Sequence, residues 1–286
     1  MLSSAVAGIA DGGGAYGLLA VALILLYRTT GVLNFAIAAV GTFGTLVASV
    51  LTTAGWPVVP AALVGMATGA GLSVAYGLIF VRWFFDSSVR YRATVAIAML
   101  LATVSLTTRV FGETPLYMPT VVNGDVARIA GVEVSGAGVL AIAVAVIVAA
   151  ILTLTLTRSR VGRQLRGISQ GPVTCELLGV PVRALSIGVW ALTGVLGSLS
   201  MLLVAPGRST AVESLGLLVV PALAASLVAV FRFYWRAVIA GILLGAAQGI
   251  LDYYNDVRVF QSTIPFVLIL VLLLWFERKE AWDEAR

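Results

Sequence analysis

Nine apolar stretches follow one another along this chain, each close to the length of a membrane crossing and separated by short polar breaks. A helix needs about 20 apolar residues to cross the hydrocarbon core of a bilayer. Lipid offers no hydrogen-bond partner, so a crossing stretch must satisfy its own backbone as a helix. We therefore predict an all-α polytopic membrane protein, a bundle of eight or nine transmembrane helices. The predicted spans are residues 12–27, 33–54, 58–81, 93–111, 137–157, 184–205, 214–231, 236–252 and 262–276.

The first and eighth predicted spans are short for a crossing, so one of them is expected to be re-entrant or extended by its neighbours. Composition supports the membrane class: 60% of the 286 residues are apolar and 11% are charged, with a mean hydropathy of +1.06. Soluble proteins run at about 45–50% apolar and about 25% charged. A water-soluble fold is therefore excluded, and residues 1–286 are expected to form a single transmembrane domain.

A polar segment at 158–183 sets the predicted orientation. It carries five arginines between two apolar runs, so it cannot lie in hydrocarbon and is expected in the cytoplasm. With that choice, 14 basic residues fall inside and 4 outside, while the acidic residues divide seven outside to six inside. A bias in Lys and Arg alone is typical of the positive-inside rule. We predict an N-terminus outside and a cytoplasmic C-terminus, and we do not expect nucleic-acid binding despite the net charge of +5.

Two polar connections have a predicted local structure. The middle of the 158–183 segment is expected to form one short helix that ends at Leu177-Leu178-Gly179, before Pro181. The longest outer loop, 112–136, contains β-like runs at Tyr117–Val122 and Val126–Val134 around Asn123-Gly124, a pattern that predicts a small hairpin. The hairpin either meets an extracytoplasmic partner or merely joins two spans.

Glycines recur at helical spacing. Gly241, Gly245 and Gly249 repeat every four residues, and the pairs Gly13/Gly17 and Gly65/Gly69 share this spacing. Small residues in such rows let helix backbones approach closely in lipid, where no hydrophobic force drives association. These glycines predict helix packing and not a substrate site.

Two polar side chains in apolar surroundings leave alternatives open. Asn34, followed by Phe35 and Ala36, either helps to form a broken helix beside a pathway or caps a helix. Gln248 inside the eighth span has the same two interpretations, and an interhelical hydrogen bond is favoured there.

The chain lacks several signatures. The predicted spans hold no ionisable residue near their middle, which counts against an ion-coupled carrier. There is no histidine, no filter-like sequence and no voltage-sensing helix. A phosphate-binding loop needs a lysine, yet the only lysine is Lys279 in the C-terminal tail. Any ATP hydrolysis must then belong to another polypeptide.

Two runs resemble the permeases of branched-chain amino acid ABC transporters. The first runs from Gly17-Leu18-Leu19-Ala20 through Tyr27-Arg28-Thr29-Thr30-Gly31-Val32-Leu33 to Asn34-Phe35-Ala36. The second is Arg158–Pro206, which contains RVGRQLRGISQ, CELLGVPV and WALTGVLGSLSMLLVAP and is similar to the family's coupling loop and the span after it. The direct matches cover about a third of the chain, and their order fits the family over nearly its whole length.

The resemblance implies a permease subunit in a bacterial inner membrane that imports branched-chain amino acids or a related small organic solute by alternating access. Its partners would be a second permease, two ABC ATPases and an extracytoplasmic solute-binding protein. This chain would bind no cofactor and no metal and would not be an enzyme, since the ATPases would use ATP and Mg²⁺. Asn34, Phe35 and Ala36 would lie near the translocation pathway. The ATPase-coupling role would fall on Arg163, Arg166, Gly167, Glu176, Leu177, Leu178 and Gly179.

Three departures from the family leave the substrate open. Ile37-Ala38 replaces a usual His-Gly, Gly171-Pro172 stands where an acidic or amide residue is common, and Phe231–Arg236 replaces a Gly-rich turn. Relatives transport branched-chain amino acids, urea, amides and other small solutes. Two other hypotheses remain at this point: an ATP-independent channel or ion-coupled carrier, and a structural membrane protein that binds a cytosolic partner.

Overall fold

The structure, a computed structural model, describes most of the chain. The described residues are 2–85, 87–112, 125–129, 132–207, 215–254 and 258–284. Each of the nine predicted spans coincides with a helix. These helices are α2 (Gly14–Thr30), α3 (Ile37–Thr53), α4 (Val58–Trp83), α5 (Val89–Phe111), α6 (Gly136–Arg158), α9 (Val182–Val204), α11 (Val219–Val228), α12 (Tyr234–Tyr253) and α13 (Ile264–Glu284). The all-α membrane fold is confirmed.

The lengths of the helices decide between the alternatives left open for the short first and eighth spans, since the first is extended by its neighbours. Within the described residues, seven helices are long and apolar enough to cross a membrane, and the two short ones are α3 and α11. The first span is instead the longest, because α1 (Leu2–Gly8) and a π-helical segment η1 (Ile9–Gly13) continue into α2 and make one helix over Ser3–Thr30. The run Asp11-Gly12-Gly13-Gly14 resembles a loop in the sequence, but glycine also permits the wider π turn.

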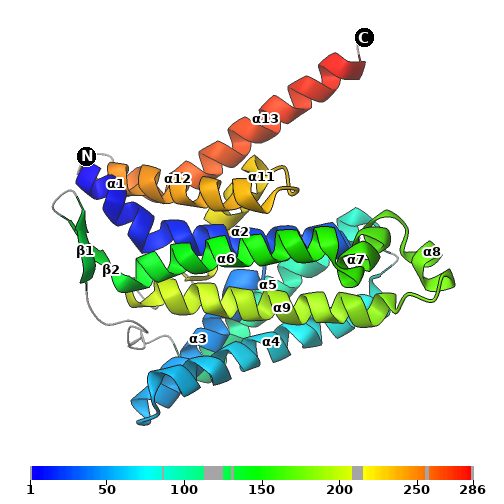
Figure 1. The fold of residues 1–286 in the computed structure, drawn as a ribbon, viewed down its shortest axis with the longest axis horizontal. Coiled ribbons are helices and arrows are strands. Elements are labelled where there is room, and N and C mark those ends of the chain that lie inside the picture. The colour runs from blue at the N-terminus through cyan, green and yellow to red at the C-terminus, as the bar shows by residue number, and fades with distance from the viewer. Residues whose placement is uncertain are drawn as a thin grey trace.

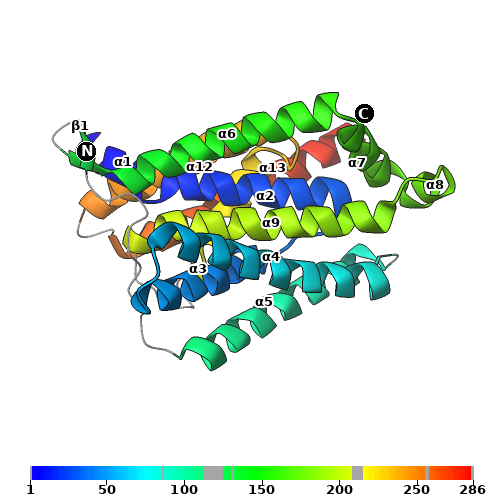
Figure 2. The same ribbon diagram turned by 60° about the horizontal axis from the view of Figure 1, so that its bottom comes forward.

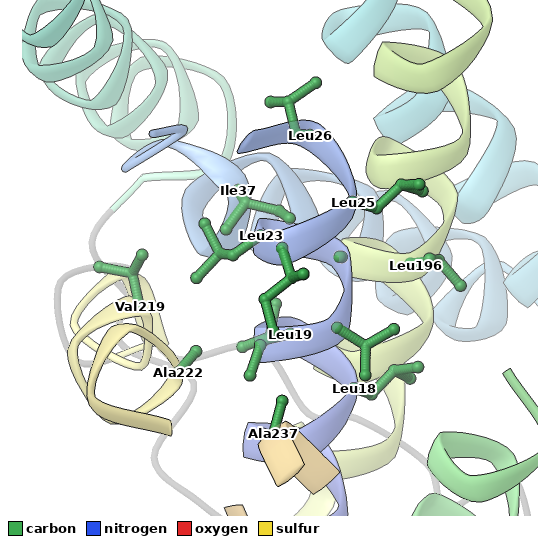
Figure 3. Packing of buried hydrophobic residues seen from close by; sticks show 14 of the residues in the cluster. Leu18, Leu19, Leu23, Leu25, Leu26, Ile37, Leu196, Val219, Ala222 and Ala237 are labelled. Carbon is green, nitrogen blue, oxygen red and sulfur yellow. The ribbon is translucent and has the colours of Figure 1, made fainter. Parts of the chain in front are cut away.

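Helix α2 forms the centre of the bundle. Every residue from Gly14 to Leu26 is buried. Figure 3 shows its leucines among Ile37 of α3, Leu196 of α9, and Val219 and Ala222 of α11. Two serines from neighbouring helices donate hydrogen bonds to α2 carbonyls, Ser200 to Ala15 at 2.9 Å and Ser226 to Ala20 at 3.3 Å. Helices α6, α9, α11 and α12 therefore surround α2 directly.

A second layer lies beside this centre. Helices α3, α4 and α9 pack closely on one another, with α5 at the edge (Figure 2). Small residues make the contacts: a Cβ at Gly44 would clash with the backbone of Gly65, and one at Gly194 would lie 2.9 Å from Ala70 Cα. Helix α13 leaves the bundle at an angle, and only 6% of its apolar window is buried (Figure 1).

The two ends of the bundle carry different elements. The N-terminus, α1 and the strands β1 (Asp125–Ile129) and β2 (Val132–Ser135) lie at one end (Figure 1). Two short helices, α7 (Arg160–Gln170) and α8 (Pro172–Leu177), lie at the other, toward which the C-terminal half of α13 also runs (Figures 1 and 2). The predicted outer loop and the predicted coupling segment are thus at opposite ends.

The hairpin exists, but its predicted position was wrong. Strands β1 and β2 pair antiparallel, with Ile129 opposite Val132, so both fall largely within the run that we predicted as the second strand. Asn123-Gly124 precedes β1 and cannot join the two strands; that dipeptide and the predicted first strand lie outside the described residues. Both strands fall within residues 125–135, a stretch with several β-branched residues, which favour strands.

Candidate functional site

The polar segment between α6 and α9 forms two helices, whereas one was predicted. Helix α7 ends at Gln170, and α8 begins at Pro172 after Gly171 in an extended conformation. Proline has no N–H to continue the first helix, and it disfavours helical geometry in the residue before it. At the first position of α8 the same proline is well tolerated. The break therefore follows from Gly171-Pro172, and it separates two helices with different surroundings.

Helix α7 is fastened to the bundle. Its side chains Leu165 and Ile168 are buried, and it contacts both α6 and α2. Gly162 lies so close to α6 that a Cβ would be 2.5 Å from Leu156 Cα. The hydroxyl of Ser159 caps the helix by accepting a hydrogen bond of 2.9 Å from the Gly162 N–H. A movement of α7 must therefore displace α6 and α2.

Helix α8 projects from the end of the molecule (Figures 1 and 2). Leu177 is 83% exposed and Leu178 is 77% exposed, and Val173 is exposed on the same short helix. The chain then turns at Gly179, whose φ of 78° is left-handed, and the Val180 N–H donates to the Cys175 carbonyl at 3.0 Å. The predicted helix end at Leu177-Leu178-Gly179 is confirmed. With Val173, the two neighbouring leucines form an exposed apolar patch, which is a candidate docking surface.

The predicted coupling residues are spread over both helices. On α7, Arg163 is exposed and Arg166 is half-buried. Gly167 faces α8, where a Cβ would lie 2.9 Å from the sulfur of buried Cys175. Glu176 approaches Arg183 at 3.8 Å, a loose surface ion pair of small energetic weight. Three of the seven residues therefore lie on the packed helix α7 and four on or just after the projecting helix α8, where the leucine pair is the exposed apolar part.

The same end of the bundle holds the C-terminus of α2 in place. Arg92, at the start of α5, donates to the carbonyls of Thr30 (3.2 Å), Phe85 (2.7 Å) and Ser87 (2.9 Å). Arg28 donates at 3.0 Å to the Arg232 carbonyl in the turn before α12. These guanidiniums satisfy carbonyls that helix ends leave unpaired.

A pocket of about 390 Å³ lies between α7 and the C-terminal end of α2. Its lining residues include Arg28, Arg92, Ile168 and Ser169. Its lining also includes Pro172, the first residue of α8, so the pocket touches the last turn of α2, the end of α7 and the start of α8.

A larger pocket of about 500 Å³ lies at the opposite end, between α1, η1, α11, α12 and the start of α13. Its lining includes the acidic residues Asp11 and Asp252 and the buried residues Tyr16 and Gln248. The Tyr16 hydroxyl donates to the Gln248 Oε1 at 2.8 Å, joining α2 to α12. Asp11 lies within the first span, which the predicted boundaries did not anticipate.

Comparison with known families decides the class. The model for the permease component of branched-chain amino acid transport systems matches residues 1–274, nearly the whole chain. The chain belongs to this family. It is therefore a multi-pass membrane permease, and the family is one of transport subunits and not of enzymes.

Solved structures share the fold of the permease. PsaBC from Streptococcus pneumoniae, solved in complex with Fab, is 12% identical with a TM-score of 0.51, over 95% of this chain and 90% of that one. A transporter described as of metal-chelate ABC type, in an inward-facing conformation, is 15% identical with a TM-score of 0.52, over 96% of this chain and 85% of that one. No curated protein sequence matches the chain. The family and the shared fold support a permease of the ABC class, which works with ATPase and other subunits.

The Asn34 motif of the permease has a clear structural role. Asn34 is 2% exposed, and its Oδ1 accepts a hydrogen bond of 2.9 Å from the Ala36 N–H. It therefore caps the turn that leads into α3. Ala36 is fully buried and Phe35 is half-buried. A pathway role for the three residues stays a prediction.

The glycine ladder of the permease lies where α12 crosses the first span. Gly241 faces Gly17, and Gly245 and Gly249 face Gly8, at backbone-to-backbone contact. A Cβ at Gly241 would lie 2.7 Å from the Gly17 Cα, and one at Gly245 would lie 2.8 Å from the Gly13 Cα. Two rows of glycine thus meet each other along one helix crossing.

Two features were not predicted from the sequence: the hydrogen bonds from Arg92 to three backbone carbonyls, and the pocket around Asp11. Arg92 was counted only as a charge that indicates the inner side of the membrane. Asp11 was counted among the outside acidic residues, because the first predicted span began at residue 12. Gly8, Gly13 and Gly17 lie before and after Asp11 in the sequence. This row of small residues was the available signal that the helix continues through Asp11.

Proposed function

We propose that this permease imports branched-chain amino acids or a related small organic solute by alternating access, driven by separate ATPase subunits. Two ATPase chains, which use ATP and Mg²⁺, would dock on one side of a bacterial inner membrane. A second permease would pair with this chain, and a solute-binding protein would deliver cargo on the other side. The observation that carries this proposal is the exposed leucine pair of α8 on a segment fastened to the central helix.

Charge supports the orientation in which α7 and α8 face the cytoplasm. Most described arginines lie at this end of the helices: Arg28, Arg82, Arg90, Arg92, Arg158, Arg160, Arg163, Arg166, Arg183, Arg232, Arg236 and Arg278. Arg109 lies at the other end of α5. The positive-inside rule then favours an external N-terminus and hairpin.

The proposed mechanism is a mechanical link along the first span. An ATPase subunit binds Leu177 and Leu178. When the ATPase moves, it displaces α8, and α8 displaces α7 through the close contact of Gly167 with Cys175. Since α7 packs on α6 and α2, the displacement reaches the central helix. The other end of that helix lines the pocket of Asp11 and Tyr16. Opening and closing of that pocket would then follow ATP binding.

Substitution of the leucine pair tests this link. Burial of a leucine at an interface contributes about 1–3 kcal/mol, whereas an exposed arginine pair contributes about 0–1 kcal/mol. We expect Leu177→Ala with Leu178→Ala to abolish transport-coupled ATP hydrolysis in the reconstituted complex, and Arg163→Ala to reduce it slightly. Both variants should melt like the wild type, because these side chains are exposed. Equal coupled ATPase rates in the wild type and both variants would reject the proposal.

One observation favours the second candidate, an ATP-independent channel or ion-coupled carrier. Asp11 lies within the first span and lines a pocket, and such carriers usually keep an ionisable group in the membrane. Purified chain in liposomes without ATPase separates the two. Solute flux in that preparation would support the carrier, and flux only with ATPase and ATP would support the importer.

A further inference from the structure

The turn between α11 and α12 gathers exposed arginines around exposed aromatic rings. The guanidinium carbon of Arg236 lies 4.3 Å from the centre of the Phe233 ring, and that of Arg232 lies 5.6 Å from the centre of the same ring. Phe233 and Trp235 are each 43% exposed, and both arginines are exposed as well. Guanidinium groups stack on aromatic rings by cation–π attraction, so one ring here positions two positive charges.

These two charges have no acidic partner among the described residues. Residues 214–251, which include all of α11 and most of α12, contain no aspartate or glutamate. The free N–H groups at the start of α12 add partial positive charge, since its first turn has no acidic residue and no side chain caps it. Two like charges beside one ring repel each other unless an anion lies near them. The turn therefore favours an anionic partner from outside the chain.

An exposed apolar stripe continues from this turn along α12. The stripe consists of Trp235, Ile239 and Leu243; Ile239 is 55% exposed and Leu243 is 63% exposed. Their spacing of four residues puts them on one face of the helix. The stripe extends over about 12 Å, most of the depth of one leaflet in a hydrocarbon core about 30 Å thick. This face of α12 thus presents positive charge at one end and apolar side chains beyond it.

This order of groups matches a phospholipid. A guanidinium group can bind two phosphate oxygens at once, and the acyl chains of the lipid would cover the apolar stripe. Membrane proteins commonly place Trp at the level of the lipid headgroups and Arg on the cytoplasmic side. An acidic segment of a soluble protein would match the arginines, but it would leave Ile239 and Leu243 uncovered.

We propose that Arg232 and Arg236 bind the headgroup of an anionic phospholipid whose acyl chains lie along the apolar stripe. The lipid belongs to the leaflet on the side of α7 and α8, since Arg28 at the end of α2 donates to the Arg232 carbonyl at 3.0 Å. An anionic lipid is preferred over a zwitterionic one, because the cationic part of a zwitterionic headgroup finds no acidic residue in 214–251. The inference goes beyond the import function and does not depend on it.

Two lipids with the same acyl chains test this preference. Dioleoylphosphatidylglycerol carries a net negative charge, and dioleoylphosphatidylcholine is zwitterionic. Native mass spectrometry of the full chain, purified in neutral detergent and titrated with each lipid, gives both affinities and the oligomeric state. Each arginine near an anionic surface contributes about fivefold in affinity, so we expect phosphatidylglycerol to bind at least about tenfold more tightly. Glycerophosphoglycerol, the headgroup without acyl chains, should not displace the lipid at equal concentration.

Two matched double variants locate the site. Arg232→Gln with Arg236→Gln should reduce the ratio of phosphatidylglycerol affinity to phosphatidylcholine affinity by at least about fivefold. The control, Arg82→Gln with Arg90→Gln, removes two exposed arginines of α4 and α5 at the same end of the bundle and should leave the ratio unchanged. All four side chains are exposed, so both variants should melt like the wild type.

Four results would overturn the proposal: equal affinity for the two lipids, an unchanged ratio in the Arg232 and Arg236 variant, an equal reduction in the control variant, or displacement by glycerophosphoglycerol. The last result would indicate a site for soluble phosphate esters. A dimer that the Arg232 and Arg236 substitutions dissociate would assign this surface to a second copy of the chain and would also reject the lipid. The import function is tested separately, by the Leu177 and Leu178 substitutions.

Discussion

The first and last spans have nearly equal hydropathy and opposite surroundings. In the first, over Ser3–Thr30, 89% of the apolar window is buried in protein, whereas in the last, over Phe260–Arg278, only 6% is buried. The first lies at the centre of the bundle, and α13 leaves it (Figure 1). Lipid tails are as apolar as leucine, so hydropathy does not distinguish a helix that faces lipid from one that faces protein.

Residue size separates these two spans. The first contains a row of small residues, with Gly8, Gly13 and Gly17 against α12 and Gly14 against α6. The segment 264–275 of α13 contains neither glycine nor alanine, and many of its large side chains are exposed, among them Phe266, Leu270 and Trp275. Close approach of backbones, which small residues permit, decides which span becomes central.

The largest expected effect is at the glycine crossing. Gly241→Leu places a bulky side chain where even a Cβ would lie 2.7 Å from the Gly17 Cα, so the helices must separate. We expect a destabilisation of about 3 kcal/mol or more, measured as loss of monodisperse protein in detergent during heating. Gly71→Leu is the control, because nothing lies within 4 Å of a Cβ there. If both variants melt alike, small-residue packing does not explain the central position of the first span.

Leucine truncation compares the two spans directly. Leu23 in α2 is fully buried, and Leu270 in α13 is 60% exposed. Leu23→Ala leaves a cavity and should cost about 2–3 kcal/mol, while Leu270→Ala should cost under about 0.5 kcal/mol in the isolated chain. Reversible unfolding from mild detergent into a denaturing one measures both. A cost at Leu270 as large as at Leu23 would show that α13 packs against protein.

The ends of the two spans on the side of α7 and α8 should also differ. Arg92→Ala removes three hydrogen bonds to the backbone, including the bond to Thr30 at the end of α2, and should cost about 1–2 kcal/mol. Arg278→Ala, near the matching end of α13, removes an exposed side chain and should change the melting temperature little. Lysine at position 92 should restore only part of the stability, since it cannot reach three carbonyls in one plane. Full rescue by lysine would indicate that charge, and not geometry, matters there.

The smallest effect is expected in the turn between α11 and α12, where the Arg232 carbonyl accepts a hydrogen bond from Arg28 of α2. Val230 and Phe231 both adopt left-handed backbone angles, with φ of 53° and 47°, which are unfavourable for a β-branched residue. Val230→Gly should raise stability by about 0.5–1 kcal/mol, as relief of strain exceeds the entropy of glycine. Val228→Gly, at the end of helix α11, should lower it by a similar amount. A lower melting temperature for Val230→Gly would mean that the valine side chain contributes more than the strain costs.

Much of the fold could be predicted from the sequence. All nine spans, the end of α8 at Leu177 and the presence of a hairpin follow from patterns along the chain. Three details could not be predicted in this way. Asp11-Gly12-Gly13-Gly14 continues a helix, Gly171-Pro172 divides one helix into two, and the hairpin lies within a single β-like run. In the first case glycine permits both the predicted and the observed backbone, so neighbouring elements made the choice, whereas in the second Pro172 ends the first helix locally.

The candidate site divides in the same way. The coupling residues form a contiguous segment, and a local pattern of arginines and leucines was enough to select them. The pocket of Asp11, Tyr16, Gln248 and Asp252 joins positions more than 230 residues apart, and no local pattern links them.

The amino-acid sequence by itself determined that this chain is a membrane protein, how many of its segments could cross the bilayer, and to which permease family it belongs. Only the tertiary structure decided that α2 is central while α13 is peripheral, and that Tyr16 meets Gln248. The reason is that transfer into the membrane depends on each segment's own apolar surface. Position within the bundle depends on the fit between segments, which exists only once they pack.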